Sequence, residues 1–432
     1  MTDVNAAQLR EENKRLRRAV DELAILNDLA LAIGGSLDSE KIMRSIVSRS
    51  IRAIHAEQGD ITLVDEDKSN PSHTLVRSMI HSSESSPQHL NQNLLGWMQI
   101  NKKPLMINDP ASDQRFRNVN WDAGIHSVLS APLMVRSRLI GVLTLYNKDV
   151  SSPEGFTDSD QRLLAIIAAQ SGQVVENARL YEEEQALQNM RHEIELAANI
   201  QKKLIPDTAP RLNGYQIAGK NVTAQTVGGD CYDFIKMDDQ RWAICLGDIS
   251  GKGLPASLLM ANLQAVLRGH TLHLDHPADI LKNANHQLFH STSPEKFATL
   301  FLGILDTSSH SLIYSIGGHE HPYLLRSDGT HLRLQAGGLP LGMLDGMEYQ
   351  QESIALKPGD CLFVYSDGVT DNVNADFEPF GEERLEKVLA SVFSEKLQPD
   401  AFIDNIFSSS MGHGGKTELF DDMTAVVLIR YD

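Results

Sequence analysis

The chain has 432 residues, which by length suggests roughly two to four domains, each able to bury its own core. Its formal net charge of −18 argues against a nucleic-acid partner, whose phosphates require a basic surface, and gives no support to binding at an anionic membrane. No uninterrupted apolar stretch reaches the ~18 residues of a membrane span, and the charged N-terminus does not resemble a secretion signal. We therefore expect a cytoplasmic protein with small, buried cysteines in place of disulfides.

Residues 1–29 predict a helix, because they are rich in Glu, Arg, Leu and Ala and contain neither Pro nor Gly. Leu9, Leu16 and Leu23 recur every seven residues, which is the spacing of a short coiled coil. An amphipathic helix packed on its own domain would satisfy the same spacing, so both interpretations are open.

Residues 30–180 mix helix and strand patterns and form the first predicted domain. Apolar spacing predicts helices over 39–56, 94–101 and 156–179. Alternating apolar residues predict strands over 61–64, 74–80, 103–108, 127–135 and 139–147.

This block resembles a GAF domain in the segments Ser130–Leu133, Leu139–Leu145 and Phe156–Asp160. The resemblance implies a sensor domain for a small molecule or a partner and leaves the ligand open. The block contains no cysteine, which excludes a bilin bound through a thioether.

Four residues of the block, Asn147, Lys148, Phe156 and Asp160, also look like the pattern of GAF domains that bind cyclic nucleotides. Gln161 stands where that pattern has Glu. The resemblance makes these four residues candidates for a sensor-ligand site, whereas in GAF domains generally Phe and Asp at this helix start are structural.

Residues 181–205 predict a second helix, with Leu180, Leu187, Ile194 and Gln201 at one heptad position. A polar Gln201 in an apolar seam is a residue of the kind that fixes register, so we assign it a regulatory role. The helix should stop at Pro206. A plain linker is the alternative, but a sensor and an output domain at its two ends favour a coiled-coil signalling helix and a homodimer.

Residues 206–432 form the last predicted domain. Its expected strands cover 215–222, 231–237, 241–247, 298–305, 312–316, 323–326, 361–365 and 424–430. Its expected helices cover 254–274, 277–290, 382–393 and 399–408. The order predicts an α+β fold, an αββα sandwich of two mainly antiparallel sheets flanked by helices.

Four acidic turns in this domain each adjoin an apolar run, at Asp230, Asp248, Asp367 and Asp421–Asp422. One such turn is unremarkable, but the repetition predicts one carboxylate cluster at the edge of a sheet. Clustered carboxylates without His or Cys favour Mg²⁺ or Mn²⁺. Two such ions about 3.5–4 Å apart can activate a bridging water for attack on phosphorus, so no side-chain nucleophile is required.

The segments around these turns, Gly228–Asp230, Gly247–Gly253, Ser366–Asp371 and Asp421–Thr424, resemble the four metal motifs of PPM-type serine/threonine phosphatases. The bacterial SpoIIE/RsbU-like branch is the most similar. Further motifs of that branch match Ala197–Pro206, Gly318–His319 with Pro322, and Gly338–Gly342.

The resemblance implies that Asp230 and Asp248 bind metal, that Asp248 bridges two ions, and that the backbone carbonyl of Ile249 is a further ligand. Asp367 and Asp421 would complete the second ion. The cofactor would be two Mn²⁺ or Mg²⁺ ions, with a third left open.

Other residues near these motifs receive different roles. Asp422 would orient a ligand without binding the ion itself. We expect turn or surface roles for Asp233 and Asp371, a solvated loop position for Lys252, and a structural turn role for His319. No arginine could be assigned to the substrate phosphate.

Together these expectations describe a metal-dependent phosphoserine/phosphothreonine phosphatase regulated by a GAF sensor. The family implies a phosphorylated STAS-type anti-sigma-factor antagonist as substrate. The alternative is a catalytically silent scaffold that binds a signalling partner through a phosphatase-like domain. A third interpretation, an enzyme that acts on cyclic nucleotides, is not supported, because no matching catalytic motif occurs outside the sensor block.

Overall fold

The computed structural model describes residues 38–64, 72–79 (backbone only), 92–117, 119, 121, 124–149, 155–293, 295–415 and 419–431. The helix predicted over 1–29 lies outside these residues. The chain divides into two compact units, Met1–Asn189 and Met190–Asp432. Helix α4 (Asp158–Lys202) runs through this division as one continuous helix, where the sequence suggested two.

The first unit is built on a five-stranded antiparallel sheet in the order β2-β1-β5-β4-β3. Its strands are β1 (Ala56–Val64), β2 (Ser72–Met79), β3 (Leu105–Ile107), β4 (Val128–Val135) and β5 (Arg138–Lys148). Its helices besides α4 are α2 (Ser39–Ile54), α3 (Gln92–Asn101) and a 3₁₀ turn at Gln114–Phe116. This is the element order that the sequence predicted for a GAF domain.

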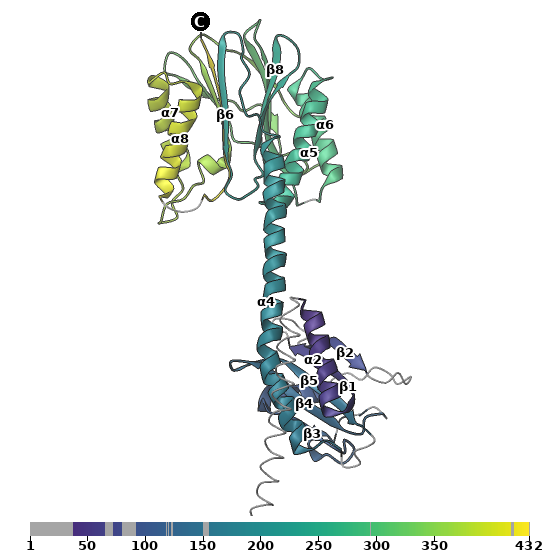
Figure 1. Ribbon diagram of the computed structural model, residues 1–432. Helices are drawn as coiled ribbons and strands as arrows, with labels where there is room; N and C mark the ends of the chain where they lie inside the picture. The colour runs from purple at the N-terminus through teal and green to yellow at the C-terminus, as the bar shows by residue number, and fades with distance from the viewer. Residues whose placement is uncertain are drawn as a thin grey trace, which may run out of the picture. The chain divides into compact units, whose positions relative to one another are not determined.

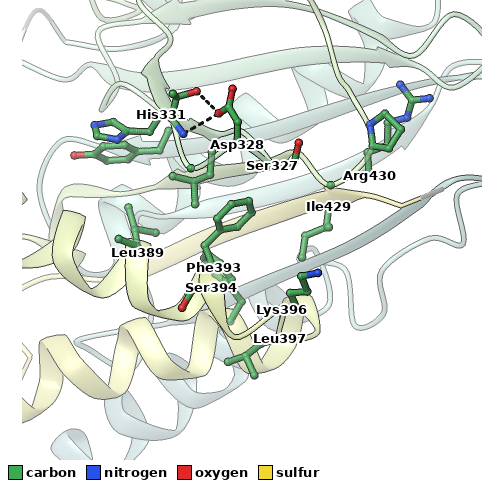
Figure 2. Close-up of a pocket in the computed structure, with 18 of the residues that line it drawn as sticks. Ser327, Asp328, His331, Leu389, Phe393, Ser394, Lys396, Leu397, Ile429 and Arg430 are labelled. Atoms are coloured by element: carbon green, nitrogen blue, oxygen red, sulfur yellow. Dashed lines mark hydrogen bonds between the residues drawn. The ribbon is translucent and has the colours of Figure 1, made fainter.

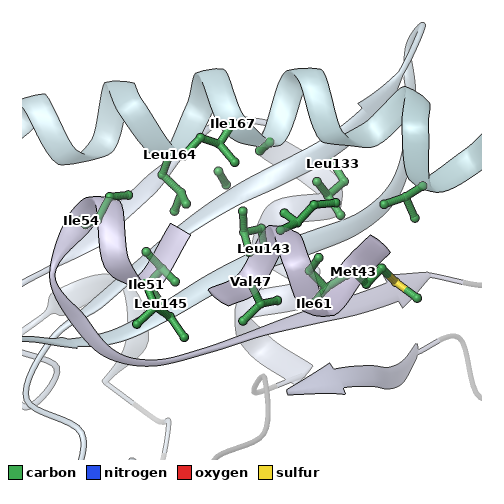
Figure 3. Packing of buried hydrophobic residues seen from close by; sticks show 14 of the residues in the cluster. Met43, Val47, Ile51, Ile54, Ile61, Leu133, Leu143, Leu145, Leu164 and Ile167 are labelled. Carbon is green, nitrogen blue, oxygen red and sulfur yellow. The ribbon is translucent and has the colours of Figure 1, made fainter. Parts of the chain in front are cut away.

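Two apolar clusters hold this unit together. Side chains of α2 and α4 pack on the sheet through residues such as Val47, Leu143 and Leu164 (Figure 3). A second cluster joins α3 to other residues of the same strands, including Leu95, Val142 and Tyr146. Because successive strand residues point to opposite faces, one sheet can carry both clusters.

The second unit contains two sheets. One has the order β13-β10-β9-β8-β7, with β14 on β10, and the other has the order β12-β11-β15-β16-β6. All pairings are antiparallel except β10 with β13. The first comprises β7 (Cys231–Lys236), β8 (Arg241–Ile249), β9 (Ala298–Asp306), β10 (Ser311–Gly317), β13 (Gly337–Gly338) and β14 (Glu352–Ala355). The second comprises β6 (Tyr215–Val222), β11 (Tyr323–Leu325), β12 (His331–Arg333), β15 (Cys361–Tyr365) and β16 (Met423–Arg430).

Helices cover the outer faces of these sheets. Helices α5 (Leu254–Thr271) and α6 (Pro277–Ser291) lie on the sheet that contains β8, and α7 (Gly381–Ser394) and α8 (Pro399–Gly414) lie on the other (Figure 1). A third apolar cluster, which includes Leu246, Phe301 and Val426, fills the space between the sheets. The predicted αββα sandwich is confirmed.

Three short strands were not predicted. Strands β12 and β14 are largely exposed and β13 spans two glycines, so none carries the apolar alternation by which strands are recognised. In the described part of the chain, no helix combines the length and hydropathy needed to cross a membrane.

Candidate metal centre

Strand pairing brings the predicted carboxylates to one end of each sheet. Strands β7 and β8 pair with Cys231 opposite Gly247, so Asp230 and Asp248 are neighbours at that end. Strands β15 and β16 pair with Tyr365 opposite Ala425. Asp367 and Asp421 therefore lie just beyond the same end of these two strands.

Hydrogen bonds join the two sheet ends to each other. The Thr424 hydroxyl donates to the Asp230 carboxylate at 2.6 Å. The Asp422 carboxylate accepts bonds from the backbone N–H groups of Ala224 and Gly229, both at 2.7 Å. Ser366 donates its hydroxyl to the backbone carbonyl of Asp422 at 3.2 Å. The four acidic segments thus form one acidic cluster, Asp230, Asp248, Asp367 and Asp421, between the sheets.

Glycines make the close approach of these segments feasible. A Cβ atom on Gly228 would lie 2.3 Å from the Asp422 carboxylate, and one on Gly368 would lie 2.0 Å from the Asp422 backbone oxygen. Neither distance leaves room for a side chain. The glycines of the motifs therefore serve the packing of segments that carry carboxylates.

Burial and the charges of neighbouring carboxylates raise the pKa values of Asp230, Asp248 and Asp367. Burial, followed by the charge of Asp248, raises the pKa of Asp230 well above its usual value. Burial also raises the pKa of Asp248. The pKa of Asp367 rises to about 7, again first through burial and then through the charge of Asp248. Anions held together in this way are stabilised by a bound cation.

The donor set fits hard divalent ions, since it consists of carboxylate oxygens. Among the described residues, no three of these carboxylates have oxygen atoms all within 4.8 Å of one another. The carbonyl oxygen of Ile249 lies 3.0 Å from the Cβ position of Gly229, next to Asp230, where it could join such a set.

Two lysines border the cluster. Lys252 is exposed in its loop, as predicted, and its ammonium lies 3.1 Å from the Asp421 carboxylate and 4.5 Å from the centre of the Phe420 ring. Lys296 donates to the backbone carbonyl of Ser250 at 3.3 Å, two residues after Asp248. The sequence around Lys296 contains no motif that marks it as a site residue. Lys296 comes close to the cluster only because the folded chain places it beside the turn that follows Asp248.

Glu320 is a further carboxylate that the sequence analysis missed. Its pKa is raised by burial and by the charges of Glu382 and Asp371, and its own charge contributes to the raised pKa of Asp367. Glu320 directly follows the Gly318–His319 motif, and this adjacency was the sequence feature that could have identified it as a site residue.

The structure also shows the surroundings of three other residues to which the sequence analysis gave roles, Asp371, Asp233 and His319. Asp371 is exposed in the turn after Asp367. Asp233 is buried and pairs with Arg268 at 2.6 Å, so the turn or surface role predicted for it is wrong. His319 is buried, bonds to the Thr299 hydroxyl at 2.8 Å, and has its pKa lowered to about 4 by burial. A neutral imidazole of this kind is unsuited to general-acid catalysis.

Gln201 lies near the end of α4 and contacts the loop that carries Asp230. Its side-chain amide donates to the Gly228 carbonyl at 2.6 Å, and its carbonyl accepts from the Gly228 N–H at 3.1 Å. This pair of bonds fixes the Gly228 backbone and buries Gln201 against its own domain, so its predicted place in an apolar helix seam is wrong, and its regulatory role stays a prediction.

The four candidate sensor residues of the first unit contact one another and the domain itself. Lys148 pairs with Asp160 at 2.9 Å, and Phe156 is buried in the core. Asn147 bonds to the Gly124 carbonyl and the Glu57 carboxylate at 2.7 and 2.9 Å. Their polar groups are thus engaged within the domain, and contact with a sensor ligand stays a prediction.

A cavity of about 850 Å³ lies elsewhere in the second unit, between α7 and the sheet that contains β16 (Figure 2). Leu389, Phe393 and Ile429 supply apolar wall, and Asp328 and Arg430 supply polar groups. No residue that lines this cavity belongs to the acidic cluster. The cavity lies near the start of β15, whereas Asp367 follows the end of β15, so the two sites are at opposite ends of this strand.

Comparison with known proteins accords with this architecture. Residues 36–176 match the GAF domain family and residues 238–431 match the family of stage II sporulation protein E (SpoIIE). The phosphoserine phosphatase RsbU of Bacillus subtilis is 31% identical over 258 residues, covering 58% of this chain and 75% of RsbU. The chain therefore belongs to the SpoIIE/RsbU-like family of PPM-type protein serine/threonine phosphatases.

Further matches include a second curated protein and a solved structure. Protein IcfG of Synechocystis is 30% identical over 271 residues, covering 56% of this chain and 42% of IcfG, so the chain spans less than half of that relative. The SiaA-PP2C domain of Pseudomonas aeruginosa is 21% identical, with a TM-score of 0.49, covering 57% of this chain and 98% of that domain.

Proposed function

We propose that the acidic cluster binds two Mn²⁺ or Mg²⁺ ions and that the second unit hydrolyses phosphoserine or phosphothreonine in a protein substrate. The observation that carries this proposal is the convergence of Asp230 and Asp248 at one sheet end with Asp367 and Asp421 at the other. Ions bound there would supply Lewis-acid activation of a water molecule and charge neutralisation at the phosphoryl group.

The chain's own residues would hold and orient this site. Asp230, Asp248, Asp367, Asp421 and the Ile249 carbonyl would be the metal ligands. Asp422 would act indirectly, because its carboxylate already accepts backbone N–H groups of the loop that leads to Asp230.

Recognition of the phosphate would fall to cations at the rim of the cluster. Lys252 and Lys296 are the lysines whose contacts support such a role. Exposed Phe420 and Leu254 flank the metal motifs, and their apolar side chains would suit contact with a protein substrate. A phosphorylated STAS-type antagonist is the substrate that the family resemblance suggests.

Regulation would reach the site through α4. The two reciprocal hydrogen bonds between Gln201 and Gly228 support a link between this helix and the Asp230 loop. We propose that the GAF domain, on binding an unidentified ligand, alters the packing of α4 in a homodimer and so shifts the metal site between two arrangements. A cytoplasmic location belongs to the same proposal.

Hydrolysis of para-nitrophenyl phosphate tests the enzymatic proposal. The purified chain should turn the ester over with Mn²⁺, lose activity in EDTA and recover it when Mn²⁺ is restored. Asp248→Asn should reduce turnover to background while its circular dichroism matches the wild type. Asp239→Asn, in the exposed hairpin between β7 and β8, is the matched control and should stay active.

Two results would contradict the proposal. Retained turnover in Asp248→Asn would remove the acidic cluster from the reaction. A wild-type chain that binds Mn²⁺ or a phosphoprotein but never releases phosphate would support the silent scaffold instead. Trapping of a phosphorylated protein by Asp248→Asn would then identify the partner in either case.

A further inference from the structure

We propose a second metal site, made by His286, His290 and Asp345, for an imidazole-preferring ion such as Zn²⁺. It lies on the outer layer of the second unit and shares no residue with the acidic cluster. The proposal does not depend on phosphatase activity.

The three side chains lie close together. His286 and His290 stand four residues apart on α6 and so lie on the same face of the helix. Asp345 spans both, with one carboxylate oxygen 2.9 Å from Nδ1 of His286 and the other 3.2 Å from Nε2 of His290. The three ligand atoms all lie within 4.8 Å of one another.

This spacing is close to what an ion would require. Zn²⁺ binds imidazole nitrogen and carboxylate oxygen at about 2.0–2.2 Å in a tetrahedron, so neighbouring ligand atoms stand on the order of 3.4 Å apart. The two observed separations differ from that by a few tenths of an ångström, within the reach of small side-chain rotations. The side chains are 62%, 57% and 39% exposed, which leaves the remaining coordination position to water.

The segment that carries Asp345 is already fixed against the helix. Asn285, the residue before His286, is buried, donates to the Leu344 carbonyl and accepts from the Gly342 N–H, both at 2.8 Å. Asp345 itself accepts the Gly346 N–H at 2.8 Å. Such contacts hold a ligand in place before the ion arrives, which lowers the entropy lost on binding.

The chemistry separates this site from the acidic cluster. Two imidazoles with one carboxylate favour Zn²⁺, Ni²⁺ or Cu²⁺, whereas the cluster offers oxygen ligands that suit Mg²⁺ and Mn²⁺. A bound ion would clamp residues 342–346 to α6 and stabilise the folded unit by mass action. Leu341, just before this segment, exchanges backbone hydrogen bonds with Ala298 at the start of β9, which ties the clamped segment to the sheet.

Metal titration of the full chain tests the site. With the acidic cluster saturated by excess Mg²⁺, Co²⁺ should bind at one equivalent, give visible absorption of a nitrogen-ligated ion, and be displaced by Zn²⁺. His290→Gln and Asp345→Asn should each weaken Zn²⁺ binding at least tenfold and abolish the rise in Tm that Zn²⁺ gives. His273→Gln changes an exposed histidine outside the cluster and should bind as the wild type does.

Equal Zn²⁺ affinity in the wild type and His290→Gln would overturn the proposal, as would the absence of Co²⁺ absorption in the Mg²⁺-saturated chain. Mn²⁺-dependent hydrolysis should be unchanged in His290→Gln. Failure of this second site is therefore distinguishable from failure of the phosphatase proposal, which would appear in Asp248→Asn and leave Zn²⁺ binding intact.

Discussion

The hydroxyl of Thr424 donates a 2.6 Å hydrogen bond to the buried carboxylate of Asp230, which lies 194 residues earlier in the chain. Thr424 belongs to β16 in one sheet, and Asp230 precedes β7 in the other. The bond therefore both joins the sheets and orients a proposed metal ligand.

Replacing Thr424 by Val tests whether the bond orients the metal ligand, because Val keeps the shape of the side chain and removes the hydroxyl that donates to Asp230. We expect the Mn²⁺ concentration for half-maximal hydrolysis to rise by roughly tenfold or more, as is typical when a group that orients a metal ligand is lost. Thr424→Ser restores the hydroxyl and should recover most of the affinity. An unchanged Mn²⁺ dependence in Thr424→Val would show that the bond only joins the sheets.

The sequence predicted the elements of this unit well because their patterns are local. Strands β8 and β15 contain apolar runs that lead to Asp248 and, two residues after β15, to Asp367, and such runs can be recognised without knowledge of the fold. The clustering of the acidic turns was predicted from their repetition beside apolar runs, whereas the meeting of the two sheets that carry them depends on packing between the sheets.

What the sequence did not predict depends on contacts between distant segments. Lys296 reaches Ser250 only after the β8 and β9 ends are paired, and nothing around Lys296 signals this. Asp233 looked like a surface residue because a lone acidic side chain is normally solvated. Its burial is made feasible by Arg268 of α5, whose position only the packed helix reveals.

Gln201 offers a test of the link between α4 and the metal site. Gln201→Leu should leave the buried N–H and carbonyl of Gly228 without their partners, which typically costs about 1–3 kcal/mol for such a group. The loosened loop should lower Mn²⁺-dependent turnover several-fold or raise the Mn²⁺ requirement. Gln188→Leu makes the same change at an exposed position of the same helix and should have little effect on hydrolysis. Equal activity of the two variants would remove Gln201 from regulation.

Gly368 should tolerate no side chain. Its Cβ would lie 2.0 Å from the backbone oxygen of Asp422, so Gly368→Ala must displace the Asp421–Asp422 turn. We expect a loss on the order of 3 kcal/mol in the free energy of unfolding, together with loss of turnover. Gly412→Ala is the control, since its Cβ meets nothing within 4 Å in α8, and it should stabilise by up to about 1 kcal/mol. Urea denaturation measures both, and wild-type stability in Gly368→Ala would contradict the tight packing.

His319 should make stability depend on pH. Burial lowers its pKa to about 4, whereas the unfolded chain has the ordinary value near 6.5, so between these values the unfolded state binds more protons. Stability from this group is therefore present above pH 6.5 and falls as the pH drops toward 4. Between about pH 7.5 and pH 5.5 the loss should be roughly 1 kcal/mol.

The effect of His319 is isolated by comparison with His319→Asn in metal-free protein. Carboxyls with raised pKa, such as Asp367, act in the opposite direction, because the folded state holds their protons as the pH falls. They are present in both chains and cancel in the difference. Urea denaturation at the two pH values should show the wild type losing about 1 kcal/mol more than the variant. Parallel losses would mean that His319 is protonated in the folded state.

The exposed apolar side chains of α4 predict a homodimer. Leu187 is 58% exposed and Met190 is 61% exposed, and Leu180 precedes Leu187 by one heptad at 49% exposure. Leu187→Glu would place a charge in the proposed seam, where its desolvation opposes association, and we expect a monomer by light scattering at micromolar concentration. Gln188→Glu adds the same charge one residue away and should stay dimeric. A wild-type chain that is already monomeric would exclude the helix seam as the route of regulation, and a dimeric Leu187→Glu would move the interface to another face.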